Sequence, residues 1–142
     1  MGVSQLAHYS IRTDDLAASE RFYTDILGLR AGYRPPFDFP GLWLYAGEDE
    51  SAFGVVHLIG TGESPDKLGS YLGTREPAGA GSGNIDHIAF LAHDWPAMRT
   101  RCEREKVRYA LRCVPELGLL QIFMTDPSGI TIELNYPARE AG

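Results

Sequence analysis

The chain has 142 residues, a formal net charge of −6 and a pI near 5.1, and 44% of its residues are hydrophobic. This size and composition are typical of one globular domain with a buried core. The acidic balance and the lack of a Lys/Arg cluster argue against nucleic-acid binding. No apolar run approaches the roughly 18 residues of a membrane span, and "MGVSQLAHYS" lacks the features of a signal peptide. Because Cys102 and Cys113 alone make no disulfide framework, we expect a reduced, cytoplasmic protein.

The first predicted elements are a strand and a helix within residues 7–27. The strand begins at "AHYSI" and carries His8. Asp14 or Asp15 then caps a helix through "LAASERFYTDIL", and Gly28 provides the left-handed residue that ends it. The apolar side chains that suit the buried face of this helix are Leu16, Tyr23, Ile26 and Leu27.

Two strands joined by a turn are predicted over residues 42–60. The second strand, within "AFGVVHLIG" (52–60), is rich in the residues of buried strands but has the titratable His57 at its centre. Trp43 and Tyr45 lie on the strand before it, where alternation can point both rings toward a cavity.

A second copy of this order of elements follows in the sequence. Placing "DHIAFLAHDWPAMRTRC" over "AHYSIRTDDLAASERFY" aligns His87 with His8, and each segment continues as an aspartate and a helix. Asp94 is the expected cap of the second helix. "LQIFMTDPSGITIELNY" then reads as strand, turn, strand, and its last strand aligns Glu133 with His57.

The repeated order predicts an α+β fold built from two βαβββ modules in a single domain, residues 1–142. Module one spans about residues 4–60, a linker about 61–84, and module two about 85–136. The linker includes "GTREPAGAGSGN", a composition typical of flexible connections. If the modules pack around a pseudo-twofold axis, the inner faces of their strands curl toward one another and form a half-barrel.

Four polar side chains occupy equivalent strand positions of the two modules: His8 and His87 on the first strand, His57 and Glu133 on the last. Burying them costs about 1–3 kcal/mol for each unpaired polar group, and more for a charge. A divalent metal ion compensates all four groups at once, and this set of donors suits Fe, Zn, Ni, Co or Mn. The repeat therefore predicts a metal site formed by these four residues.

Three segments resemble the vicinal oxygen chelate superfamily, also described as the glyoxalase/bleomycin resistance protein/dioxygenase family. "LAHYSIRTDDLAASERFYTDILGL" is similar to the opening of that family, and "NIDHIAF" and "MTDPSGITIELNY" are similar to hallmark stretches of its second module. The resemblance covers nearly the whole chain and implies paired βαβββ modules around a half-barrel metal site. It also implies that His8, His87 and Glu133 are metal ligands.

His57 departs from the pattern of the family, because glyoxalase I has a carboxylate at this position and methylmalonyl-CoA epimerase a glutamine. His57 is either a fourth ligand or an acid–base group beside the metal, as a second-sphere histidine is in extradiol dioxygenases. We expect a ligand whose side chain shares a cavity with Glu133. Extradiol dioxygenases usually add a tyrosine on the strand before the glutamate, where this chain has Phe123.

The leading hypothesis for function is an enzyme in which a divalent metal polarises adjacent oxygens of a small substrate while Glu133 or His57 moves a proton. This is glyoxalase- or epimerase-like lyase or isomerase chemistry. The alternatives are Fe(II)-dependent cleavage of a catechol-like ring and metal-free binding of a drug by a resistance protein; the complete ligand set argues against the latter. The side chains expected to line the substrate pocket are Trp43, Tyr45 and Phe123.

We expect the partners of this protein to be a small-molecule substrate and a second copy of the chain, and neither nucleic acid nor a membrane. A homodimer is expected because an open half-barrel leaves sheet edges and apolar faces that relatives bury against a partner. Both arrangements of the site, within one chain or across two, occur in the family that the sequence resembles.

Overall fold

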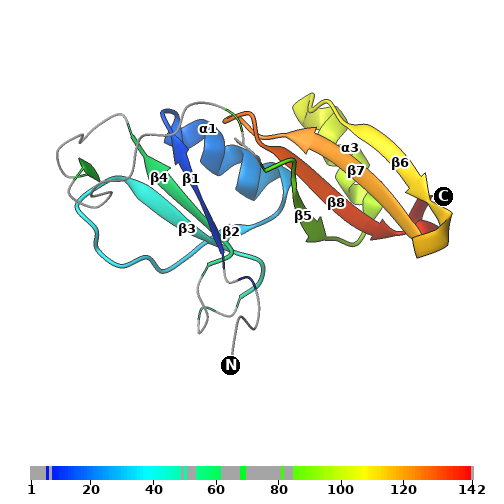
Figure 1. Cartoon of the computed structure of the whole chain (residues 1–142), viewed down its shortest axis with the longest axis horizontal. Helices are drawn as coiled ribbons and strands as arrows, with labels where there is room; N and C mark the ends of the chain where they lie inside the picture. Colours follow the sequence, from blue (N-terminus) through cyan, green and yellow to red (C-terminus); the bar gives the residue numbers. More distant parts are fainter. Residues whose placement is uncertain are drawn as a thin grey trace. The chain divides into compact units, whose positions relative to one another are not determined.

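The structure is a computed structural model, and it describes residues 6, 8–48, 50, 54–61, 68–69, 81 and 85–141. The chain divides into two compact units, residues 1–79 and residues 80–142. Each unit contains one four-stranded sheet and one main helix (Figure 1). Most of the predicted linker lies outside the described residues.

The first unit is a βαβββ module. Its strands are β1 (Tyr9–Thr13), β2 (Arg30–Ala31), β3 (Gly41–Tyr45) and β4 (Val56–Gly60). They lie in the order β1-β4-β3-β2, with β1 parallel to β4 and the other pairs antiparallel. The central position of β4 buries all five of its residues, which explains why its sequence is almost entirely apolar.

The helix of the first unit begins as predicted but ends differently. The Ala18 backbone N–H donates to Asp15 Oδ1 at 2.9 Å, so Asp15 is the cap of α1 (Leu16–Arg21). The chain then continues as a π-helix, η1 (Phe22–Ile26), where a regular helix through residue 27 was predicted. The Thr24 hydroxyl donates to the Glu20 carbonyl at 2.8 Å and so competes for the acceptor of a regular helical bond, which favours this wider turn.

The second unit repeats the module. Its elements are β5 (Ile88–Leu91), α3 (Trp95–Glu105), β6 (Ala110–Val114), the 3₁₀ turn η2 (Pro115–Leu117), β7 (Leu119–Thr125), β8 (Thr131–Pro137) and the 3₁₀ turn η3 (Ala138–Ala141). The strand order β5-β8-β7-β6 is that of the first unit, with β5 parallel to β8. The predicted α+β fold of two βαβββ modules is therefore confirmed.

Strand register shows which positions of the two units are equivalent. Trp43 on β3 lies opposite His57 on β4, and Phe123 on β7 lies opposite Glu133 on β8. In both units the aromatic residue lies on the third strand of the module, and this strand pairs antiparallel with the fourth strand, which carries His57 or Glu133. His57 and Glu133 thus occupy the same place in the two sheets, as the sequence repeat predicts.

The core of the second unit lies between α3 and one face of its sheet. The ring of Trp95, at the start of α3, lies 5.7 Å from the ring of Tyr136 on β8. The other buried side chains of this layer include Met98, Cys102, Ile132 and Leu134. Because side chains alternate along a strand, Glu133 faces the opposite side of the sheet from α3.

Both cysteines of the chain lie in the second unit. Cys102 is buried in α3, Cys113 is exposed on β6, and both thiols are free. Within the described ranges, no helix is long and apolar enough to cross a membrane.

Asp94 caps α3 from a left-handed backbone conformation with φ of 64°, and its Oδ1 accepts from the Ala97 backbone N–H at 3.2 Å. Asp94→Ala removes the cap and leaves a residue that disfavours this conformation. We expect it to lower the free energy of unfolding by about 1–2 kcal/mol, measured by urea denaturation. Asp94→Asn is the matched control, because asparagine caps helices and tolerates this backbone, and it should cost little. Equal stability of the alanine variant and the native chain would contradict this assignment.

Candidate functional site

In the second unit His87 and Glu133 are in direct contact. His87 precedes β5, Glu133 lies on β8, and His87 Nε2 is 2.9 Å from Glu133 Oε2. The glutamate is only 6% exposed, whereas the imidazole is partly open to solvent. Two ligands held about 2.1 Å from one ion at a right angle lie roughly 3 Å apart, so this spacing suits a shared metal ion as well as a hydrogen bond.

A further polar group holds each of these two side chains. His87 Nδ1 lies 2.7 Å from Asp86 Oδ2, and Gln121 Nε2 donates to Glu133 Oε1 at 2.8 Å. The same Gln121 nitrogen donates to Asn135 Oδ1 at 3.0 Å. The hydrogen bond with Asp86 raises the pKa of His87, and the charge of Glu133 adds to this effect against the opposing effect of burial.

Sequence reasoning did not identify Asp86 or Gln121 as part of the site. The signal for Asp86 was its position directly before His87. The signal for Gln121 was its place on β7 two residues before Phe123, which puts both on one face of the sheet. Polar side chains next to a candidate ligand are the usual partners that orient it.

In the first unit the ring of His57 is stacked between two other rings. Its centroid lies 3.8 Å from that of His8 and 4.0 Å from that of Trp43, with interplanar angles of 15° and 6°. Trp43 is the cross-strand neighbour of His57 on β3, while His8 directly precedes β1 on the other side of β4. The predicted residues His8 and His57 are therefore brought together within this unit.

The structure gives His57 the properties of a neutral imidazole with one available lone pair. The residue is 8% exposed, and its Nε2 is buried with no hydrogen-bond partner in the part of the chain that is described. Burial lowers the pKa of His57 to about 4; His8 contributes in the same direction, and a hydrogen bond with the Gly54 backbone opposes the shift. A neutral ring with Nε2 unprotonated can bind a metal or accept a proton.

The stack limits how His8 and His57 could bind one ion. A metal ion lies near the plane of each imidazole that binds it, and two nearly parallel rings 3.8 Å apart share no such position. One ring must therefore turn if both are ligands. Stacking contributes about 0.5–1.5 kcal/mol, whereas a four-ligand zinc site contributes about 10–16 kcal/mol in total, so metal binding outweighs the stack. Imidazole nitrogens and a carboxylate are, by their chemistry, donors that suit a divalent metal ion.

The described contacts join the four predicted ligands in two pairs, His8 with His57 and His87 with Glu133, one pair in each unit. Among the residues that the structure describes, no group of three or more His, Cys, Asp or Glu side chains gathers in a metal-binding arrangement. Each pair is thus formed by contacts within its own unit.

Two of the three predicted pocket aromatics adjoin these pairs. Trp43 stacks on His57, and the ring of Phe123 lies edge-on to that of His87 at 6.2 Å between centroids. Both rings therefore lie on the sheet face that carries the candidate acid–base group of their unit. An apolar ring at this place shields the polar pair from water on one side.

The third predicted aromatic, Tyr45, is buried at the end of β3. Its hydroxyl donates to the Tyr33 carbonyl at 2.6 Å, and the Arg30 guanidinium lies 5.6 Å from its ring centroid. The Tyr45 hydroxyl therefore binds the backbone of the segment that follows β2.

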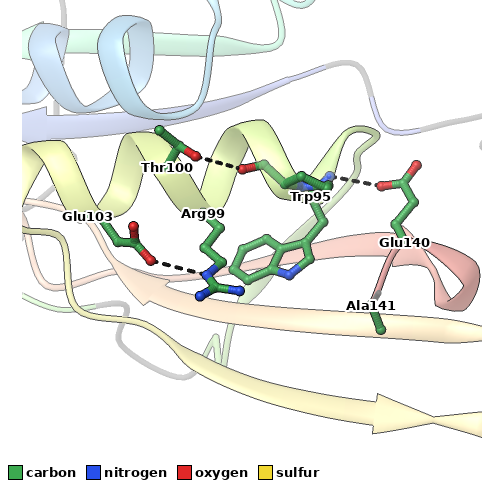
Figure 2. A pocket seen from close by; sticks show the side chains of 7 residues that line it. Trp95, Arg99, Thr100, Glu103, Glu140 and Ala141 are labelled. Atoms are coloured by element: carbon green, nitrogen blue, oxygen red, sulfur yellow. Dashed lines mark hydrogen bonds and ion pairs between the residues drawn. The ribbon is translucent and has the colours of Figure 1, made fainter.

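A hollow of about 350 Å³ lies beside α3 in the second unit (Figure 2). The residues that line it are Trp95, Pro96, Arg99, Thr100 and Glu103 of that helix, with Glu140 and Ala141. The Glu140 carboxylate accepts from the Trp95 backbone N–H at 2.9 Å, and Arg99 pairs with Glu103 at 3.1 Å. Both carboxylates are thus engaged in structural contacts. The hollow contains none of the predicted site residues and lies on the α3 side of the sheet, which Glu133 does not face.

The lowered pKa of His57 predicts a dependence of stability on pH. Between pH 6.5 and about 4 the unfolded chain binds a proton at His57 that the folded chain does not, so the free energy of unfolding falls as pH drops through this range. We expect a loss of about 2 kcal/mol between pH 7.5 and pH 5 from this residue. Urea denaturation with a chelator present should show a weaker pH dependence for His57→Gln. His93→Gln is the matched control, because it removes an exposed imidazole that takes no part in the stack. An unchanged dependence in His57→Gln would contradict the assignment.

Comparisons with known proteins agree with this architecture. The model of the Glyoxalase/Bleomycin resistance protein/Dioxygenase superfamily matches residues 5–134. One similar solved structure is a lactoylglutathione lyase from Agrobacterium tumefaciens, with 21% identity, a TM-score of 0.64 and 96% of both chains covered. No curated protein matches the sequence.

Two further solved structures extend the range of known activities on this fold. The fosfomycin resistance protein FosX from Listeria monocytogenes has 16% identity and a TM-score of 0.62, with 95% of this chain and 94% of that chain covered. The antibiotic binding protein TnmS3 from Streptomyces sp. CB03234 has 20% identity and a TM-score of 0.59, with 96% and 98% covered. At these identities the likeness establishes the fold alone.

Proposed function

Because the chain belongs to the glyoxalase/bleomycin resistance protein/dioxygenase superfamily, we propose that it is a metal-dependent enzyme acting on a small substrate with two adjacent oxygen atoms. The reaction class is that of a lyase or isomerase of the glyoxalase or epimerase kind. The observation that carries the proposal is the contact of His87 with Glu133. It places an imidazole nitrogen 2.9 Å from an oxygen of a buried carboxylate, and a further polar group holds each side chain.

The proposed ligands are His8, His57, His87 and Glu133, supplied by one chain or by the two chains of a homodimer. Three imidazole nitrogens and one carboxylate suit Fe, Zn, Ni, Co or Mn. When bound, the ion would polarise the two substrate oxygens and stabilise the negative charge that develops there.

Proton transfer in this proposal belongs to Glu133, or to His57 if Nε2 is not bound to the ion. Glu133 presents Oε2 to His87 on the sheet face opposite α3, while Gln121 holds Oε1. His57 is available as an acceptor because its ring is neutral at pH 7, but the burial that lowers its pKa also makes it the weaker base while the ring stays buried. Trp43, Phe123 and Tyr45 would form the apolar part of the substrate pocket.

The proposal is tested by metal analysis of anaerobically purified protein followed by an exchange experiment. We expect stoichiometric Zn, Ni, Co or Mn. We also expect metal-dependent exchange of the substrate C–H proton in D₂O, followed by NMR on the hemithioacetal of a 2-oxoaldehyde or on a 2-substituted malonyl thioester. Protein that neither retains nor binds any divalent metal would contradict the proposal.

A second candidate function is Fe(II)-dependent cleavage of a catechol-like ring. It is favoured by the neutral His57 ring with its unpartnered Nε2, the form that an acid–base histidine needs beside the iron. Phe123 weighs against it, because it offers no hydroxyl on the strand before Glu133. Stoichiometric iron and oxygen uptake with a catechol would favour this candidate over the first.

Metal-free drug binding is the remaining alternative. Tight binding of an antibiotic by protein that takes up no metal would support it.

For any of these functions we propose a cytoplasmic homodimer. Leu91, which is 91% exposed on the edge strand β5, supports burial of this edge by a partner.

A further inference from the structure

Gln121 is placed to act on Glu133 by the register of β7 and β8. Gln121 lies opposite Asn135, and Phe123 lies opposite Glu133, so Gln121 is the diagonal neighbour of the glutamate on one face of the sheet. Its Nε2 donates to Glu133 Oε1 at 2.8 Å and to Asn135 Oδ1 at 3.0 Å. Both hydrogens of the amide are therefore used by these two acceptors.

This arrangement determines which way the Gln121 amide faces. The reversed amide would point its carbonyl oxygen at the Glu133 carboxylate, and two acceptors repel each other. The Glu133 carboxylate thus sets the orientation of the Gln121 amide, and Asn135 Oδ1 accepts its second hydrogen. Because Oε1 is retained, Oε2 is the oxygen that faces His87 at 2.9 Å.

The first unit shows that the fold itself does not require these two amides. The positions equivalent to Gln121 and Asn135 are Gly41 and Ile59, which lie opposite each other on β3 and β4. The first unit forms the same sheet with a glycine and an isoleucine there. Gln121 and Asn135 are present in the module that has the Glu133 carboxylate and are replaced in the other module. This difference indicates that the two amides act on Glu133.

Asp86 is the other side chain that holds a member of the pair, but it is less well placed to do so. Its side chain is 94% exposed, so water competes for its contact with His87. The Gln121 contact, in contrast, lies partly buried against a glutamate that is almost completely enclosed.

We infer that Gln121 is a positioning residue that fixes the Glu133 carboxylate so that one oxygen, Oε2, is offered to a metal ion or substrate. This inference rests on the proposed function. It predicts that Glu133 binds an ion through one oxygen and that removal of the Gln121 amide weakens metal binding without removing any ligand.

The test is the full-length variant Gln121→Met, which keeps the length of the side chain and removes the amide. Its affinity for Co²⁺, measured by competition with a chromophoric chelator, should fall roughly 10–100-fold, the usual effect of losing an outer partner of a metal ligand. The visible spectrum of bound Co²⁺ should also change, since the freed carboxylate can alter the geometry at the ion. Far-UV circular dichroism verifies that the variant is folded.

Thr131→Val is the matched control, because Thr131 lies on the same face of β8 two residues before Glu133. It should bind Co²⁺ as the native chain does. Native affinity and a native spectrum in Gln121→Met would overturn the inference while leaving the metal site in place. Failure of the native chain to bind Co²⁺ or any other divalent ion would instead contradict the proposed function.

Discussion

Glu133→Gln will lower the affinity for divalent metal ions by about 10³-fold or more and reduce turnover below detection. The substitution removes the carboxylate and its negative charge from the proposed set of three imidazoles and one glutamate. A four-ligand site that contributes about 10–16 kcal/mol in total corresponds to roughly 2.5–4 kcal/mol for each ligand, and a carboxylate lies at the upper end because it is charged. Chelator competition with Zn²⁺ or Co²⁺ measures the loss directly.

The glutamine variant also tests whether the effect is local. Its amide oxygen can still accept the hydrogen bond that Gln121 donates to Glu133 Oε1, so we expect the sheet to keep its stability. Glu140→Gln is the matched control in the same unit, because Glu140 contacts the Trp95 backbone on the other side of the sheet. It should bind metal as the native chain does. Native metal affinity in Glu133→Gln would remove Glu133 from the ligand set.

His57→Ala is expected to weaken metal binding about 100-fold, less than the glutamate variant because it removes a neutral ligand. Metal binding by His57 must disturb its stack with Trp43, either by turning the ring or by polarising it at Nε2. The emission of Trp43 should therefore change on addition of Zn²⁺. The chain has two tryptophans, so Trp95→Phe provides a background in which Trp43 is observed alone.

Two other outcomes of the His57 experiment have distinct meanings. If His57 acts beside the ion as an acid–base group, His57→Ala will keep its metal while turnover falls by roughly 10²–10⁴-fold. If both metal content and turnover remain native, His57 is a core histidine whose stacked ring serves packing only. The second outcome would contradict both functional assignments of this residue.

The order of residues alone was sufficient for the architecture and for the equivalent positions of His57 and Glu133 in the two sheets. Strand alternation and the repeat placed His57 and Glu133 at equivalent positions, and the registers opposite Trp43 and Phe123 agree. The helix cap at Asp94 was also predictable. These features depend on neighbours close in sequence, whose geometry within a strand or a helix turn is nearly constant.

Contacts between distant strands determined the rest. The stack of His8, His57 and Trp43 depends on β1 and β3 flanking β4, although no two of these three side chains are close in sequence. The bond from Gln121 to Glu133 likewise depends on the register of β7 with β8, and a shift of one residue would turn one of the two to the opposite face. Register and strand order are set by the packing of the whole sheet. For that reason the partners that orient Glu133 and His57 appear only once the chain is folded.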